Sequence, residues 1–180
     1  MSLTDDLTQH YFAFFGLTPA FGIDLTALEN NFRKIQSESH PDRFVSASPA
    51  EKLKSMQVAT FANEAYQTLK QPALRAKYLL ELQGITAISE TNTAMPADFL
   101  MQQMEWREAL DDAKSAKDID ALDDLLAEIR QSASALKANL ATLIDEKKDY
   151  VGATADTRKL IFIDKVSQDI NKVIEQIENS

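Results

Sequence analysis

The residues best suited to chemistry in this sequence form one short motif, His40-Pro41-Asp42. The imidazole can donate or accept hydrogen bonds, the carboxylate can bind an arginine of a partner, and proline fixes the backbone direction between them. Those properties favour recognition of another protein. A lone histidine in a polar loop is more often only a solvated side chain, so the surrounding elements must decide between the two interpretations.

Other groups that could support catalysis are scarce. The 180 residues include two histidines and no cysteine, and there is no glycine-rich phosphate loop or serine nucleophile elbow. The acidic pairs Asp111-Asp112 and Asp123-Asp124 are adjacent residues, whose side chains on a helix point ~100° apart and cannot share a proton. No calcium-loop sequence accompanies them. We therefore expect no catalytic residues, no metal site and no cofactor.

Charge and composition limit the partners. The formal net charge is −9, and residues 86–180 hold 19 acidic side chains against 11 basic ones. Phosphate backbones and anionic lipids would repel such a chain, so we expect neither nucleic acid nor membrane as a partner, although an acidic solvated surface also explains the charge. The chain start lacks signal or transit features, and no apolar run approaches ~18 residues, so we predict a soluble cytoplasmic protein.

Helical periodicity dominates the first half, where we expect helices over residues 4–15, 25–39, 49–70 and 73–82. Pro41 ends the second of these helices because it disfavours helical geometry at the preceding residue. A capping box at Ser48-Pro49-Ala50-Glu51 begins the third. The apolar stripe expected to face the core from the second helix, behind a possible Asp24 cap, is Leu25, Leu28, Phe32 and Ile35.

The second half predicts a bundle of three helices, over residues 98–116, 118–149 and 154–178. One apolar stripe marks the last helix and includes Ile163, Val166, Ile170 and Val173. The residues around Pro96 are polar and form a linker. We therefore predict an all-α protein with an N-terminal module (residues 1–85), a linker (residues 86–97) and a C-terminal three-helix bundle (residues 98–180).

With its flanking helices, the tripeptide resembles the signature of a DnaJ-type J-domain. The helix after it carries Asn63-Glu64-Ala65-Tyr66, and Arg75-Ala76-x-Tyr78 follows. The resemblance extends over almost the whole chain to the HscB family of iron–sulfur co-chaperones, through blocks that begin at His10, Ser39, Leu74, Phe99 and Arg158. Membership would imply that the J-domain stimulates the ATPase of an HscA/DnaK-type chaperone, while the bundle carries an IscU-type iron–sulfur scaffold protein to it.

A basic patch accompanies the tripeptide. If the apolar stripe of the preceding helix faces the core, Arg33 and Lys34 point outward, and with Arg43 they could meet an acidic groove on the chaperone. A solvated helix face predicts the same residues. Family J-domains usually have basic or aromatic residues directly before the histidine, whereas this chain has Ser37-Glu38-Ser39, which affects affinity or partner preference. The predicted chaperone-binding residues are His40, Pro41, Asp42, Arg33, Lys34 and Arg43.

The helix expected from residue 98 has more apolar residues than one core requires. At ~100° per residue, Phe99, Trp106 and Leu110 share one side with Ala113 and face the bundle core. Other apolar residues lie opposite among acidic neighbours, which suits a docking surface for a basic partner. The resemblance implies that these positions and that of Phe162 bind the scaffold. The predicted scaffold-binding residues are Leu100, Met101, Met104, Glu105, Glu108, Asp112 and Phe162.

Several alternatives stay open. Contact between the two modules would also explain the apolar residues at 100, 101 and 104, and Phe162 could pack within the bundle. The first half alone does not separate a dedicated iron–sulfur co-chaperone from a general J-domain co-chaperone with another client. Many general J-proteins have a Gly/Phe-rich or cysteine-rich region after the J-domain. No such region follows the first half of this chain. A non-catalytic helical adaptor explains the bundle but not the J-like half.

Overall fold

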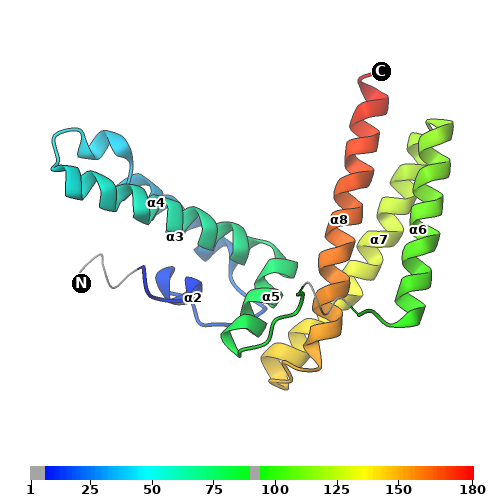
Figure 1. The fold of residues 1–180 in the computed structure, drawn as a ribbon, viewed down its shortest axis with the longest axis horizontal. Helices are drawn as coiled ribbons and strands as arrows, with labels where there is room; N and C mark the ends of the chain where they lie inside the picture. Colours follow the sequence, from blue (N-terminus) through cyan, green and yellow to red (C-terminus); the bar gives the residue numbers. More distant parts are fainter. Residues whose placement is uncertain (1–6, 90–93) are drawn as a thin grey trace. The chain divides into compact units, whose positions relative to one another are not determined.

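The computed structural model describes residues 7–89 and 94–180, and this part of the chain is built from helices (Figure 1). Residues 4–6 of the first expected helix and 90–93 of the expected linker lie outside the described residues. The elements are α2 (Tyr11–Phe14), α3 (Leu25–Glu38), η1 (Pro41–Phe44), α4 (Pro49–Lys70), α5 (Pro72–Leu82), α6 (Ala97–Ala116), α7 (Ile119–Leu140), η2 (Ala141–Glu146) and α8 (Ala153–Glu178).

The helices form two compact units, which divide between Leu79 and Leu80 within α5. This division reflects which residues pack together. The module boundaries expected from the sequence, at residues 85 and 98, therefore stay a prediction. No helix within the described ranges is long and apolar enough to cross a membrane.

In the first unit, α3 and α4 form an antiparallel hairpin. Both helix starts are capped as the sequence predicts: Asp24 Oδ1 accepts from Ala27 N at 3.0 Å, and Ser48 and Glu51 form the capping box. Phe32 of α3 stacks on Tyr66 of α4, with 4.1 Å between ring centroids. The predicted stripe was wrong at one position, because Leu25 lies in the first turn, beyond the packed part of the hairpin, and is 50% exposed.

The first helix is much shorter than expected. Among the described residues only α2, a single turn, is α-helical before α3. His10 caps this turn by accepting a hydrogen bond from Ala13 N, and Gly16, at φ 67°, ends it. Aromatic packing then fixes the turn: the Tyr11 ring stacks on Tyr78 of α5, with centroids 4.5 Å apart, and Tyr11 N donates to the Tyr78 hydroxyl.

Arg75 is a buried cation at the start of α5, 6% exposed. Its Nε donates to the carbonyl of Phe21 at 2.6 Å, and its Nη1 donates to the carbonyl of Leu69 at 2.8 Å. The guanidinium also lies over the Phe21 ring, 5.0 Å from the centroid. Arg75 therefore joins the segment before α3 to the end of α4, which stabilises the base of the hairpin.

The second unit contains the three-helix bundle of α6, α7 and α8. Phe99, Trp106 and Ala113 of α6 are buried as predicted, and so are the residues of the α8 stripe from Ile163 to Val173. The indole Nε1 of Trp106 donates to Glu128 Oε1 of α7 at 3.1 Å, which satisfies the one polar atom of this buried ring.

The second bundle helix is shorter than the sequence predicts. The regular helix ends at Leu140, and the wider π-type turn η2 follows and keeps Ile144 buried. Lys148, at φ 53°, then turns the chain toward α8. Near the start of α8, the guanidinium of Arg158 donates to the carbonyls of Ala87 and Ala94, so one side chain links α8 to two positions of the chain before α6.

Candidate functional site

The tripeptide forms the tip of the α3–α4 hairpin. His40 is the N-cap of η1, and its Nδ1 accepts a hydrogen bond from Asp42 N at 3.2 Å. Pro41 occupies the first turn of η1, where its missing N–H costs nothing. The His40 and Asp42 side chains remain 55% and 89% exposed. The loop is thus ordered by its own hydrogen bonds while its polar groups face solvent.

Three of the predicted chaperone-binding residues line one shallow hollow beside the tripeptide, of about 410 Å³. We call it the basic hollow, and its lining residues are Arg33, Gln36, Ser37, His40 and Arg43. Lys34 is exposed but does not line it, because one residue along a helix turns the side chain by ~100°. Arg33 is partly neutralised by an ion pair with Glu29 at 2.6 Å.

The three residues before His40 point to different sides of α3. Ser37 lines the basic hollow, whereas Glu38 and Ser39 line a separate cavity between α3, η1 and α4. Ser39 is 6% exposed, and its hydroxyl donates to the carbonyl of Ile35 at 2.8 Å. Of the three residues, Ser37 therefore changes the basic hollow, Glu38 is exposed on the side of the second cavity, and Ser39 is buried.

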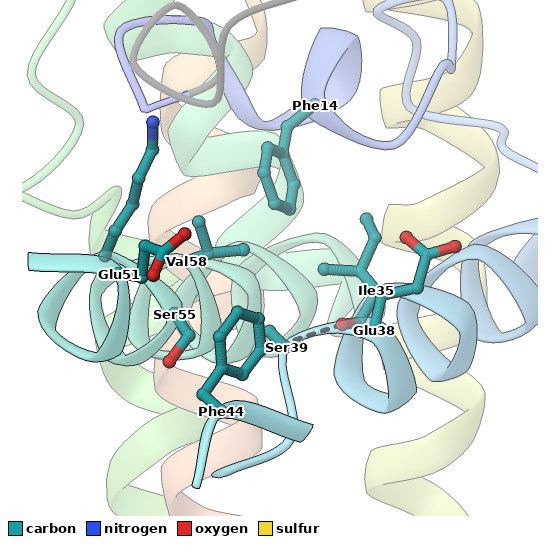
Figure 2. A pocket seen from close by; sticks show the side chains of 9 residues that line it. Phe14, Ile35, Glu38, Ser39, Phe44, Glu51, Ser55 and Val58 are labelled. Atoms are coloured by element: carbon teal, nitrogen blue, oxygen red, sulfur yellow. Dashed lines mark hydrogen bonds between the residues drawn. The ribbon is translucent and has the colours of Figure 1, made fainter. Parts of the chain in front are cut away.

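The second cavity, which we call the loop cavity, has a volume of about 510 Å³ and is lined by residues of α2, α3, η1 and α4 (Figure 2). Figure 2 shows Phe14 and Phe44 at opposite sides of it. The Ser48 backbone and side-chain hydrogen bonds hold the pKa of Glu51, at its rim, below the usual carboxyl value. The complete lining is Phe14, Ile35, Glu38, Ser39, Phe44, Glu51, Lys54, Ser55 and Val58.

The second predicted site lies on the outer side of α6. Leu100, Met101 and Met104 are 46%, 64% and 71% exposed, unusually high for large apolar side chains within a folded bundle. The acidic residues on the same side of α6, Glu105, Glu108 and Asp112, are exposed too, and in the described part of the chain no ion pair holds them. We call this surface the α6 face, and it consists of Leu100, Met101, Met104, Glu105, Glu108 and Asp112.

The α6 face extends around the helix from the side of α7 to the side of α8. Met101 and Glu105 line a hollow of about 470 Å³ that also includes Leu136 of α7. On the other side, Phe162 of α8 lies half-buried, edge-on to Phe99 with 6.1 Å between centroids. Phe162 therefore packs partly within the bundle and keeps an exposed edge.

Arg107 is a neighbour of this face that the sequence reasoning missed. Its guanidinium lies 5.9 Å from the centroid of the Phe162 ring. Helical spacing could have indicated it, since Arg107 follows Met104 by three positions and Leu100 by seven, which places all three on one side of α6. Similarly, Gln36 of the basic hollow follows Arg33 by three positions. Neither residue belongs to the apolar and acidic pattern of α6 or the basic pattern of α3 on which the predicted sites were based.

Residues 95–171 match the family model described as the HSCB C-terminal oligomerisation domain. The "Co-chaperone protein HscB homolog" of Azoarcus sp. (strain BH72) is 45% identical over 174 residues, which cover 97% of this chain and 98% of the relative. The homologue of Burkholderia mallei (strain SAVP1) is 48% identical over 173 residues, with coverage of 96% and 98%.

Solved structures agree with the fold. "Chaperone HscB from Vibrio cholerae" superposes with a TM-score of 0.82 at 36% identity and covers 94% of this chain and 99% of its own. The human co-chaperone protein HscB gives a TM-score of 0.81 at 27% identity, with coverage of 91% and 81%. The predicted fold class, an all-α J-domain joined to a C-terminal helical bundle, is confirmed, and the chain belongs to the HscB co-chaperone family.

Proposed function

We propose that this protein stimulates the ATPase of an HscA/DnaK-type chaperone and delivers an IscU-type scaffold to it during iron–sulfur cluster assembly or transfer. The observation that carries the proposal is the presence of two exposed sites of different chemistry, one in each unit. The tripeptide lies beside a basic hollow, whereas the α6 face is apolar and acidic. A co-chaperone needs one surface that binds the ATP-dependent chaperone and another that binds the client protein.

The first site suits an acidic surface of the chaperone. Arg43 and the partly neutralised Arg33 surround His40, and the Asp42 carboxylate can accept a bidentate hydrogen bond from an arginine of the partner. The partner itself hydrolyses ATP. The tripeptide acts by binding the hydrolysis-competent conformation of the chaperone more tightly than other conformations, which shifts the population toward it.

The first test is the substitution His40→Gln. His40 is exposed and contributes to no core, so we expect an unchanged thermal unfolding transition and unchanged scaffold affinity, with loss of ATPase stimulation. The assay is steady-state ATP hydrolysis by the chaperone, titrated with wild-type or variant protein. Full stimulation by His40→Gln would contradict the role proposed for the tripeptide.

The second site suits a basic and partly apolar partner. Exposed methionines adapt to irregular surfaces, and Glu105 and Glu108 favour positively charged neighbours. A general J-domain co-chaperone is the second candidate function, and the distinction lies in the client. We expect calorimetric titration to detect binding of a folded IscU-type scaffold and no binding of an unfolded model client. The reverse outcome would favour the general co-chaperone, and binding of neither would favour an adaptor with another partner.

A further inference from the structure

We propose that Phe44 is a positioning residue, which holds the tripeptide in its chaperone-binding conformation by anchoring η1 in the loop cavity. The inference rests on the proposed function of the tripeptide and adds a residue that does not contact the partner. Phe44 is the last residue of η1, the single turn that includes Pro41 and Asp42. It is also the one side chain of that turn that points inward, since residues 40–43 are exposed.

Phe44 turns toward the inside of the hairpin, on the side where η1 contacts α4. Phe44 is half-buried and lines the loop cavity together with Ile35 of α3 and Val58 of α4 (Figure 2). Ile35 is half-buried and Val58 is 6% exposed, so the walls belong to the packed hairpin. Because η1 has only one turn and its own hydrogen bonds are short-range, we infer that the inward Phe44 ring holds it against the rigid helices.

Ser39 fixes the opposite end of the loop. It is buried, and its hydroxyl donates to the carbonyl of Ile35, the dashed line in Figure 2. The loop from His40 to Arg43 is therefore held on one side by a hydrogen bond and on the other by the Phe44 ring. A ring at one end and a hydroxyl at the other leave the tripeptide exposed but restrict its position.

The prediction concerns the affinity of the chaperone for this protein, not the maximal rate at which the bound chaperone hydrolyses ATP. If Phe44 holds the loop, truncation lowers the fraction of molecules in the competent conformation, and the apparent dissociation constant rises by the inverse of that fraction. Loss of a half-buried phenylalanine ring corresponds to a change of about tenfold. We expect Phe44→Ala to raise the concentration needed for half-maximal ATPase stimulation about tenfold, with the maximum unchanged.

Two further variants separate positioning from other effects. Phe44→Leu keeps an apolar anchor and should restore most of the stimulation. Val45→Ala is the matched control, because Val45 is the next residue, is apolar and is 70% exposed, and it should behave as wild type. NMR relaxation of the full chain without any chaperone should show greater motion of the backbone amides of residues 42–43 in Phe44→Ala, with the amides of α4 unchanged.

The outcomes are distinguishable. Unchanged half-maximal concentration and unchanged motion of residues 42–43 in Phe44→Ala would overturn the positioning role. An equal loss in Phe44→Leu would also overturn it, because a direct aromatic contact with the partner would then be the cause. If Phe44→Ala does not fold, Phe44→Leu and Val45→Ala carry the comparison. Should wild-type protein stimulate no chaperone, the proposed function fails, while the relaxation measurement still tests the anchor.

Discussion

Replacing Leu100, Met101 and Met104 together by alanine should weaken scaffold binding without weakening the fold. Full burial of a leucine or methionine side chain is worth about 1.5–3 kcal/mol. These three are 46%, 64% and 71% exposed, so that fraction of each remains for a partner to cover. Together this gives roughly 3–5 kcal/mol of gross binding energy. Alanine keeps the Cβ atom of each side chain, and part of each wild-type side chain stays hydrated in the complex. About half of that binding energy should therefore be lost.

A loss of about 2 kcal/mol corresponds to an increase of about thirtyfold in the dissociation constant. Isothermal titration calorimetry of the full chain with the IscU-type scaffold measures it directly. The unfolding free energy should change by less than about 0.5 kcal/mol, because the truncated atoms are exposed in the wild type. Basal ATPase stimulation should be unaffected, since the tripeptide belongs to the other unit.

Val151→Ala provides the matched control, since Val151 is apolar, 77% exposed and belongs to the same unit between η2 and α8. Its scaffold affinity should equal that of the wild type. A change of less than twofold in the triple variant would refute the assignment of the α6 face. Unchanged affinity together with a lower unfolding temperature would instead assign these side chains to packing within the chain.

Two further predictions concern stability. Arg75→Leu should lower the unfolding free energy by about 3 kcal/mol, because it leaves the buried carbonyls of Phe21 and Leu69 without their donor; urea denaturation measures this, and a loss below about 1 kcal/mol would contradict the account. Burial raises the pKa of Asp164, against the opposing charge of Lys137. The folded state therefore binds the proton more tightly than the unfolded state. The free energy of unfolding accordingly falls as the pH rises from the unfolded pKa of Asp164 through its raised folded pKa. Asp164→Asn should accordingly be more stable than the wild type at neutral pH, and the difference should shrink on acidification; a difference that grows in acid would contradict the sign.

The sequence was most informative where local rules act. Helix starts at Asp24 and Ser48 follow from the hydrogen-bonding groups of single side chains, and Pro41 ends α3 as expected because it acts on its immediate neighbour. The two sides of α6 also follow from helical spacing. These features depend on residues within one turn of each other, so no knowledge of the tertiary structure is required.

Features that depend on tertiary packing were less accessible. The His10 cap and Gly16 bound the single turn α2 locally, but its attachment through Tyr11 to Tyr78, 67 positions away, depends on the tertiary structure. The regular part of α7 ends at Leu140 rather than near residue 149, since η2 widens the turn while Ile144 remains buried. The inward position of Ser39 and the anchoring of Phe44 likewise depend on where α4 lies relative to α3.

The hydrogen bond within the tripeptide also determines its tautomer. Because Nδ1 of His40 accepts the amide hydrogen of Asp42, the neutral ring carries its proton on Nε2. His40 therefore offers a partner a donor, whereas the Asp42 carboxylate offers acceptors. A partner that binds the tripeptide as proposed would supply the opposite arrangement, an acceptor facing His40 and a donor facing Asp42. On the proposed function, the donor and the acceptor are in place before the chaperone binds, and a chaperone surface with the two groups exchanged would not match them.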